Sequence, residues 1–426
     1  MQPVRLQIHG DQRRTHSRTD DRRITFAGLA VSALLLGAAA TTLVAPDGAR
    51  RGLWLPLHLA LAGAAGTAIA SALPFFTAAL AVAPPAGRPT RILAIGGIAG
   101  GALVVSGGVA AGAPAVAVGG GLTYLVGLAA VAVAAFGPLR GALGPRRELV
   151  TRAYAVAIGC VATGVILSTA YLSGLAVVVE RWALLKPAHA WLNVVGFLSL
   201  VVAATLIHLA PTVAGARMQP RASARVAISG IAAGPPTLAI GLALALDYLV
   251  RLGAALTMAG ALALVIHGFV VRTERGRWTT DPAWHRLTSG SLLLAPIWFA
   301  IGVSVAAAPF LRSGADPLAW DVAAVSPALA IGWIAQVLVG AWSHLLPAIG
   351  PGDPLAHRRQ RRILGTAATG RLVALNAGVG LAMIGSFAAA PVVEAFGAIL
   401  AAGSVLAALI AFGGAARIGL AATRGN

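Results

Sequence analysis

The residues best suited to chemistry in this sequence are four histidines inside long apolar runs: His58, His189, His208 and His344. Imidazole is a common metal ligand and a common axial ligand of haem iron. An ionisable side chain in such an apolar segment is costly and tends to serve a function. We therefore treat these four histidines as candidate haem or metal ligands, with copper as the alternative to haem.

A structural role is the alternative for each of them, because a neutral histidine also hydrogen-bonds a neighbouring helix or lies at a lipid interface. The single cysteine, Cys160, excludes an internal disulfide and a Cys-x-x-Cys motif. No carboxylate lies in the middle of an apolar run. We predict no catalytic residue, and we expect that the chain is not a stand-alone enzyme.

The composition predicts that membrane-spanning helices position these residues. Of 426 residues, 58% are hydrophobic and 11% are charged, whereas soluble domains carry about 25% charged residues. A hydrocarbon core of ~30 Å needs roughly 20 apolar residues for each helix. Twelve apolar runs meet this length, at 24–45, 53–83, 92–112, 114–137, 152–179, 188–210, 224–246, 252–271, 286–309, 319–347, 366–391 and 393–416.

Basic residues predict the direction of these spans. With the N-terminus in the cytoplasm, the cytoplasmic segments hold most of the 32 Lys and Arg, and the outer segments keep Arg50, Arg51, Arg181, Lys186, Arg251 and Arg312. An excess of Lys and Arg is typical of the cytoplasmic loops of membrane proteins. We expect a multi-pass protein of the cytoplasmic (inner) membrane with both termini in the cytoplasm.

The domain organisation follows from the same pattern. Residues 1–23 are expected to form a basic cytoplasmic arm without regular structure, residues 24–417 a single transmembrane helical domain, and residues 418–426 a cytoplasmic tail. The formal net charge of +19 is then explained by loops at the membrane surface. The predicted partner is the lipid bilayer and not nucleic acid.

A faint repeat appears in three helices that are four spans apart. Gly63, Gly196 and Gly332 are separated by 133 and 136 residues, and twelve residues after each glycine stand Phe75, His208 and His344. Each of the three helices ends in a leucine–proline element. Fixed-period similarity predicts a repeat architecture, here of three four-helix repeats.

The helix directions sort the four histidines by depth. His58 and His189 lie in the first turns of the second and sixth spans, near the predicted outer face, and His208 and His344 lie near the cytoplasmic ends of the sixth and tenth spans. A bis-histidine haem needs two imidazoles at one depth on different helices. Both pairs meet the depth condition, and we favour the outer pair.

Three segments of the chain resemble a known class of membrane region: WLPLHLALAGAAGTAIASALPFF at 54–76, KPAHAWLNVVGFLSLVVAATLIHLAPTVAGARM at 186–218 and WIAQVLVGAWSHLLPAIGPGDP at 333–354. They are similar to the multi-spanning region that accompanies a cupredoxin-type domain in actinobacterial copper oxidases or nitrite reductases. That region resembles, more distantly, the NnrS-like and haem-copper oxidase subunit I class, whose twelve helices form three four-helix arcs.

The resemblance implies a haem- or copper-binding component of redox or nitrogen-oxide metabolism, served by an extracytoplasmic redox protein. His58 matches the haem-bearing position on the second helix of subunit I, but His344 lies at the opposite end of the tenth helix, and the seventh helix has no histidine. Because of these two departures from subunit I, we expect no oxygen-reducing haem–copper centre. A twelve-span transporter and a non-catalytic membrane anchor or assembly factor remain the alternative functions.

Overall fold

The computed structural model describes residues 12–42, 45–141, 148–278, 280–316, 323–349 and 353–422. Over these residues the fold is all-α and contains no strand, and twelve helices are long and apolar enough to cross a membrane. The predicted fold class, an all-α membrane protein with twelve spans, is confirmed. The protein is therefore an integral membrane protein with many spans.

The chain divides after its fourth span into two compact units, Met1–Arg147 and Glu148–Asn426. Unit 1 contains the short helix α2 (Asp47–Arg50), the 3₁₀ turn η2 (Gly137–Gly141) and four spans. The spans are α1 (Gln12–Thr42), the continuous helix α3–η1–α4 (Trp54–Leu57, His58–Ala65, Gly66–Ala81), α5 (Arg88–Ala110) and α6 (Pro114–Phe136).

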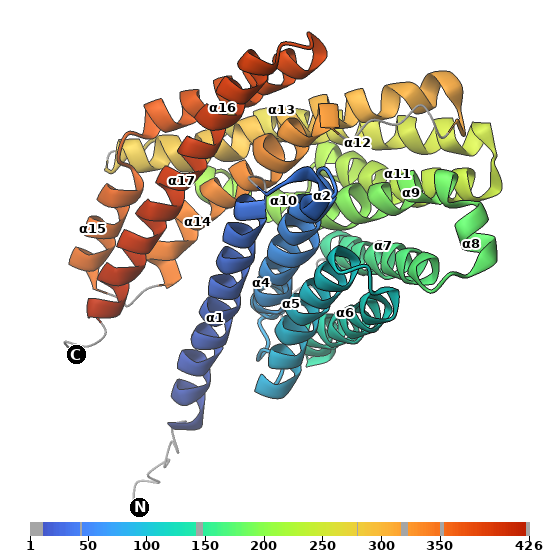
Figure 1. The fold of residues 1–426 in the computed structure, drawn as a ribbon. Helices are drawn as coiled ribbons and strands as arrows, with labels where there is room; N and C mark the ends of the chain where they lie inside the picture. Colours follow the sequence, from blue (N-terminus) through green and yellow to red (C-terminus); the bar gives the residue numbers. More distant parts are fainter. Residues whose placement is uncertain are drawn as a thin grey trace, which may run out of the picture. The chain divides into compact units, whose positions relative to one another are not determined.

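Unit 2 contains the other eight spans, and two further helices do not cross the membrane: α8 (Ala176–Glu180) and α15 (Pro354–Leu364). The spans are α7 (Glu148–Leu172), the continuous helix α9–η3–α10 (Trp182–Ala190, Trp191–Ser199, Leu200–Ala214), α11 (Ala222–Leu244), α12 (Asp247–Thr273), α13 (Pro282–Ser313), the continuous helix η6–α14 (Pro327–Ala335, Gln336–Ile349), α16 (Ala368–Phe387) and α17 (Pro391–Ala422). Figure 1 shows their order along the chain.

The structure corrects the expected ends of several segments. Helix α1 begins at Gln12, so the predicted arm is helical from that residue, because an apolar helix once nucleated extends into flanking residues at little cost. Residues 1–11 of the arm and 423–426 of the tail lie outside the described residues. The fifth span ends at Leu172, since Gly174 takes a positive φ of 78° that glycine adopts without strain. Helix α15 was not predicted, because its sequence contains four arginines and no long apolar run.

The second helix of each predicted repeat contains a π-helical segment, namely η1, η3 and η6. Gly63, Gly196 and Gly332 each occupy the sixth position of their segment. Each segment packs between the first and third spans of its own repeat: η1 between α1 and α5, η3 between α7 and α11, and η6 between α13 and α16. Because π-helical turns are rare and often mark functional sites, their recurrence at one position is structural evidence for the repeat.

The third and fourth spans of each repeat form a closely packed hairpin, as Figure 1 shows for α5 with α6 and for α11 with α12. Glycines make this approach possible, since a Cβ at Gly97 would lie 2.5 Å from the Cα of Gly127 and one at Gly230 would lie 2.8 Å from the Cα of Gly260. The second glycine pair lies 133 residues after the first, which is the interval between the first two repeats. Gly378 has the same role against Ala401 in α17. Small residues let membrane helices approach in this way.

Candidate functional site

The two predicted outer histidines lie near the first residues of two π-helical segments. His58 is the first residue of η1 in unit 1, and His189 lies two residues before η3 in unit 2. Both side chains are half-buried. Each unit therefore carries one of these histidines close to the start of a π-helical segment, although the 133-residue interval places Trp191 and not His189 at the position of His58.

The imidazole of His58 is held by its own helix. Its Nδ1 lies 2.7 Å from the backbone oxygen of Trp54, one turn earlier, and its ring stacks on the indole of Trp54 with 4.0 Å between the ring centroids. The stacking and the hydrogen bond together restrict the ring to one orientation.

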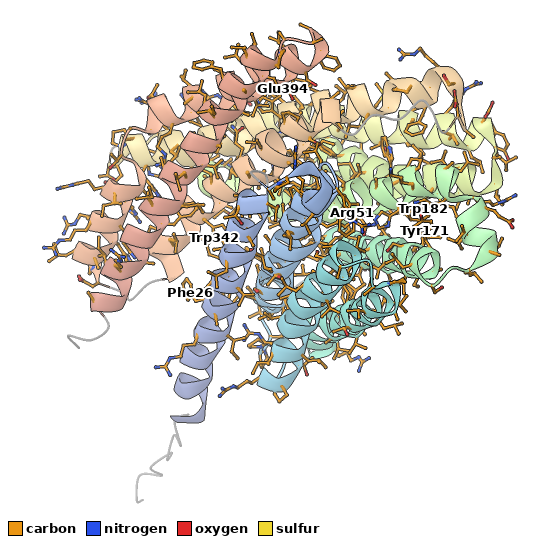
Figure 2. All side chains as sticks on the ribbon, viewed as in Figure 1. Phe26, Arg51, Tyr171, Trp182, Trp342 and Glu394 are labelled. Carbon is orange, nitrogen blue, oxygen red and sulfur yellow. The ribbon has the colours of Figure 1, made fainter. Side chains whose placement is uncertain are left out.

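The imidazole of His189 is held by a neighbouring span. Its Nδ1 lies 2.8 Å from the backbone oxygen of Gly164 in α7. The amide of Asn193 donates to the backbone oxygen of His189 at 2.7 Å and lies 3.2 Å from the same Nδ1. Trp182 stacks on Tyr171, and Figure 2 labels both side chains. The ring centroid of Trp182 lies 6.2 Å from that of His189.

For both histidines the short contact to a backbone carbonyl selects one tautomer, and the Asn193 amide nitrogen, itself a donor, then makes no hydrogen bond with Nδ1 of His189. A backbone carbonyl only accepts hydrogen bonds, so a short contact between it and Nδ1 requires a proton on Nδ1. The lone pair of each ring then lies on Nε2. Metal-ligating histidines commonly have this arrangement, in which a second partner fixes the tautomer and the ring orientation. The arrangement is compatible with coordination of iron through Nε2.

The two predicted inner histidines lie on different spans of unit 2. His344 in α14 stacks on Trp284 of α13, with 5.5 Å between the ring centroids. His208 lies half-buried in α10. Coordination of a haem by the inner pair stays a prediction.

His344 belongs instead to a cluster that we name the tryptophan–histidine cluster: Trp278, Trp284, His285 and His344. His285 stacks on Trp278 at 4.5 Å and meets Trp284 edge-on at 4.6 Å. The indole of Trp284 donates to the backbone oxygen of Ser343 at 2.6 Å, which ties α13 to α14. The guanidinium of Arg361 in α15 lies 4.8 Å from the centroid of the Trp284 ring, a cation–π contact, and is paired with Asp281 at 3.4 Å.

Sequence reasoning missed this cluster. The adjacent Trp284 and His285 at the start of α13, six residues after Trp278, were a usable signal. Ser343, whose backbone oxygen accepts from Trp284, lies 59 residues further along the chain, and no local sequence pattern indicates that pairing.

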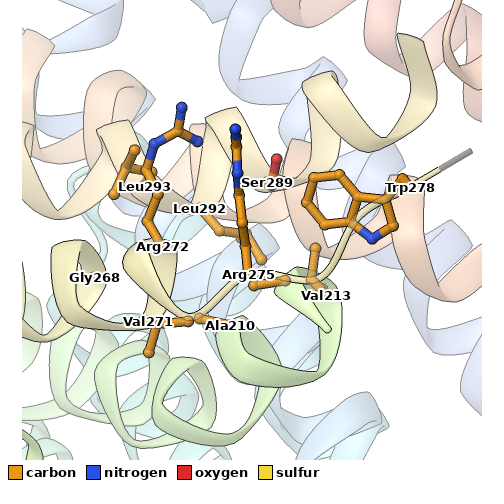
Figure 3. A pocket seen from close by; sticks show the side chains of 11 residues that line it. Ala210, Val213, Gly268, Val271, Arg272, Arg275, Trp278, Ser289, Leu292 and Leu293 are labelled. Atoms are coloured by element: carbon orange, nitrogen blue, oxygen red, sulfur yellow. The ribbon is translucent and has the colours of Figure 1, made fainter. Parts of the chain in front are cut away.

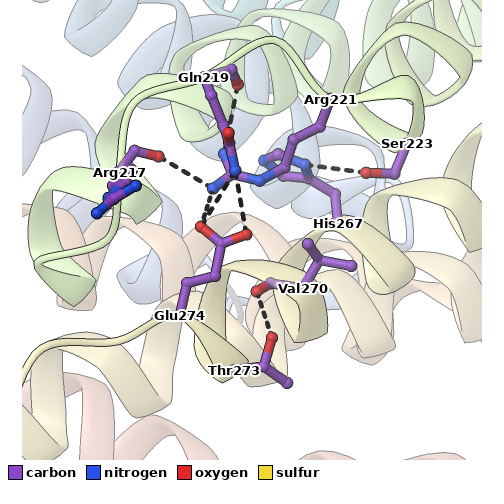
Figure 4. A network of polar contacts seen from close by, with 8 residues as sticks. All are labelled: Arg217, Gln219, Arg221, Ser223, His267, Val270, Thr273 and Glu274. Atoms are coloured by element: carbon purple, nitrogen blue, oxygen red, sulfur yellow. Dashed lines mark hydrogen bonds and ion pairs between the residues drawn. The ribbon is translucent and has the colours of Figure 1, made fainter.

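His267 in α12 is a buried histidine with a structural role. It is 2% exposed, and its Nδ1 lies 3.3 Å from the hydroxyl of Ser223 at the start of α11. Beside it, Arg221 forms an ion pair with Glu274 at 2.5 Å and donates to the backbone oxygen of Arg217 at 3.0 Å. Figure 4 shows these residues as one network, which fastens the start of α11 to the end of α12.

Polar groups without partners are concentrated in the third repeat. Gln336 in α14 is fully buried, and within the described residues neither atom of its amide has a hydrogen-bond partner. Ser291 and Ser343 are also fully buried, and within the described residues neither hydroxyl has a hydrogen-bond partner. Unmet buried polar groups are uncommon in native proteins, so this stretch of α13 and α14 is unusually polar for the interior of a span.

Over the described residues, no group of three or more His, Cys, Asp or Glu side chains comes together to hold a metal ion. The donors available at the candidate site are thus single imidazoles. In comparisons with known proteins, no family model matches the chain, and no curated protein matches it.

Proposed function

We propose that this integral membrane protein is a haem-binding component of redox or nitrogen-oxide metabolism, of the kind implied by its resemblance to NnrS-like proteins and haem-copper oxidase subunit I. The iron is held near the predicted outer face through Nε2 of His58 or of His189. The observation that carries the proposal is the hydrogen bond from Nδ1 of each ring to a backbone carbonyl, 2.7 Å in one case and 2.8 Å in the other.

The available donors favour haem over copper. A haem iron takes only one or two ligands from the protein, because the porphyrin supplies the other four. A protein copper site is typically built from several nitrogen and sulfur ligands. Single imidazoles, each with its tautomer fixed, meet the first requirement and not the second.

The protein's own residues would orient and tune the group. The carbonyls of Trp54 and Gly164 keep the proton on Nδ1, which makes Nε2 the more basic atom. Asn193 limits rotation of the His189 ring through its bond to the backbone of that residue. Haem bound there would supply one-electron transfer, and a site near the outer face suits exchange with an extracytoplasmic redox protein.

Two features argue against the transporter alternative. The chain divides into units of four and eight spans, whereas a facilitator-type transporter is built from two six-helix halves. The sequence also places no carboxylate in the middle of a span, where a proton- or sodium-coupled carrier commonly has one.

The test is the absorption spectrum of protein purified from a haem-competent host. We expect a Soret band that is lost or strongly reduced in His189→Ala or in His58→Ala. His208→Ala and His344→Ala are the matched controls, since they remove an imidazole from the predicted inner side, and they should retain the band. Each variant must be eluted as a monodisperse species, so that loss of haem is separated from loss of fold.

A folded wild-type protein without a Soret band would refute the proposal. Loss of the band only in His208→Ala or His344→Ala would move the site to the inner side and would contradict the assignment of ligands. Metal analysis of the same preparation reports copper directly, and one copper per chain without haem would favour the alternative cofactor.

A further inference from the structure

A basic notch lies between α10, α12 and α13 of unit 2, on the predicted cytoplasmic side. We name it the Arg272 notch, and Figure 3 shows Arg272 and Arg275 beside each other above it, with Trp278 at its rim. The cavity itself has a volume of about 30 Å³. It adjoins an open basin of about 740 Å³ that is lined by the same three residues and by Arg277.

The arginines of the notch have no acidic partner in the described structure. The two nearby carboxylates of the connection between α12 and α13 are engaged elsewhere: Glu274 pairs with Arg221, and Asp281 pairs with Arg361. Arg272, Arg275 and Arg277 are all exposed. Three arginines within six residues of chain, with both neighbouring carboxylates paired elsewhere, make a positive surface that is complementary to a phosphate group.

The floor of the notch is apolar. It is formed by Ala210 and Val213 of α10, Val271 of α12, and Leu292 and Leu293 of α13. The hydroxyl of Ser289 stands among them and donates to the backbone oxygen of His285 at 2.7 Å, which leaves its oxygen as an acceptor. An apolar floor below a basic rim fits a molecule with a charged head and a hydrocarbon tail.

We propose that the Arg272 notch binds an anionic phospholipid of the cytoplasmic leaflet. The phosphate lies against Arg272 and Arg275, the upper part of an acyl chain lies on the half-buried Ala210 and Leu293, and Trp278 lies at the level of the head groups, as interfacial tryptophans do. Basic pockets between membrane helices on the cytoplasmic side have the chemistry to bind such head groups. This site is independent of the histidines and of any cofactor.

The test measures lipid binding to the purified protein by native mass spectrometry during titration with phosphatidylglycerol, phosphatidylcholine or inorganic phosphate. We expect retention of phosphatidylglycerol over phosphatidylcholine, and no protection of the site by phosphate alone. A surface arginine contributes enough to anionic lipid binding that each substitution should weaken it about fivefold. The double variant Arg272→Gln/Arg275→Gln should therefore bind roughly 25-fold more weakly if the two residues act independently.

The matched control is Arg358→Gln/Arg359→Gln, which removes the same charge from exposed positions of α15 on the same predicted side. It should bind phosphatidylglycerol as the wild type does. Equal binding by the notch variant and the wild type would overturn the proposal. Equal losses in both double variants would show attraction by net charge alone, and full competition by inorganic phosphate would show a site for free phosphate; either result also overturns it.

Discussion

At the residue scale, the candidate ligands could be selected from the sequence because an imidazole in an apolar run is conspicuous. What holds each imidazole could not be predicted. The carbonyl that contacts His189 belongs to Gly164, on the preceding span, and glycine in an Ala- and Gly-rich helix carries no signal of such a contact. The stacking of His344 on Trp284 likewise depends on the packing of α13 against α14, which only the folded chain specifies.

One residue-scale prediction concerns the junction of the second and third repeats inside unit 2. The indole of Trp333 in η6 donates to the hydroxyl of Ser199 in η3 at 3.0 Å, and that hydroxyl donates to the backbone oxygen of Val194 at 2.8 Å. Trp333→Phe and Ser199→Ala should each reduce the free energy of unfolding in micelles by about 1 kcal/mol. The double variant should reveal a coupling of about 0.6 kcal/mol.

The control for that cycle combines Ser199→Ala with Trp298→Phe. The Trp298 indole donates to Asn376 and not to Ser199, so the two effects should add. Additive effects of Trp333→Phe and Ser199→Ala would show that the bond contributes nothing to the junction between η3 and η6.

At the element scale, all twelve spans could be predicted from hydropathy, because a helix in lipid must be long and apolar. The π-helical segments could not, since an extra residue in a helical turn leaves hydropathy unchanged. The glycines at 63, 196 and 332 were visible, but only the structure shows that each is the sixth residue of such a segment. Helix α15 escaped prediction because four of its residues are arginine, although its Ala356, Gln360 and Leu364 are buried along one side.

The element-scale prediction compares two adjacent glycines of α5. A Cβ at Gly101 would lie 2.6 Å from the backbone nitrogen of Tyr124 in α6, whereas a Cβ at Gly100 would have nothing within 4 Å. Gly101→Ala should therefore force α5 and α6 apart and lower the melting temperature of the purified protein. Gly100→Ala is the matched control and should leave it unchanged or raise it slightly, because alanine is the better helix former. Equal melting temperatures for the two variants would contradict the close packing of this hairpin.

At the scale of the whole molecule, one glycine in each of three helices predicted three four-helix repeats. The structure extends that evidence to the π-helical segments and to the glycine hairpins within each repeat. In the third repeat α15 is inserted between the second and third spans, α14 and α16. The repeat also predicts that Phe75, His208 and His344 lie at similar depth about a pseudo-threefold axis, which stays a prediction.

Both proposals depend on one claim, that the chain crosses the membrane twelve times in these repeats with its first span running outward. Single cysteines in a Cys160→Ser background, probed with a membrane-impermeant maleimide, test it most directly; the native Cys160 is buried. Ser173→Cys and Ser313→Cys, exposed on the predicted outer side, should be labelled in intact cells. Gln219→Cys and Thr280→Cys, exposed on the predicted inner side, should be labelled only after the membrane is opened. Labelling of residue 219 or 280 in intact cells would contradict the topology, and with it the predicted outer location of His58 and His189 and the predicted inner location of the Arg272 notch.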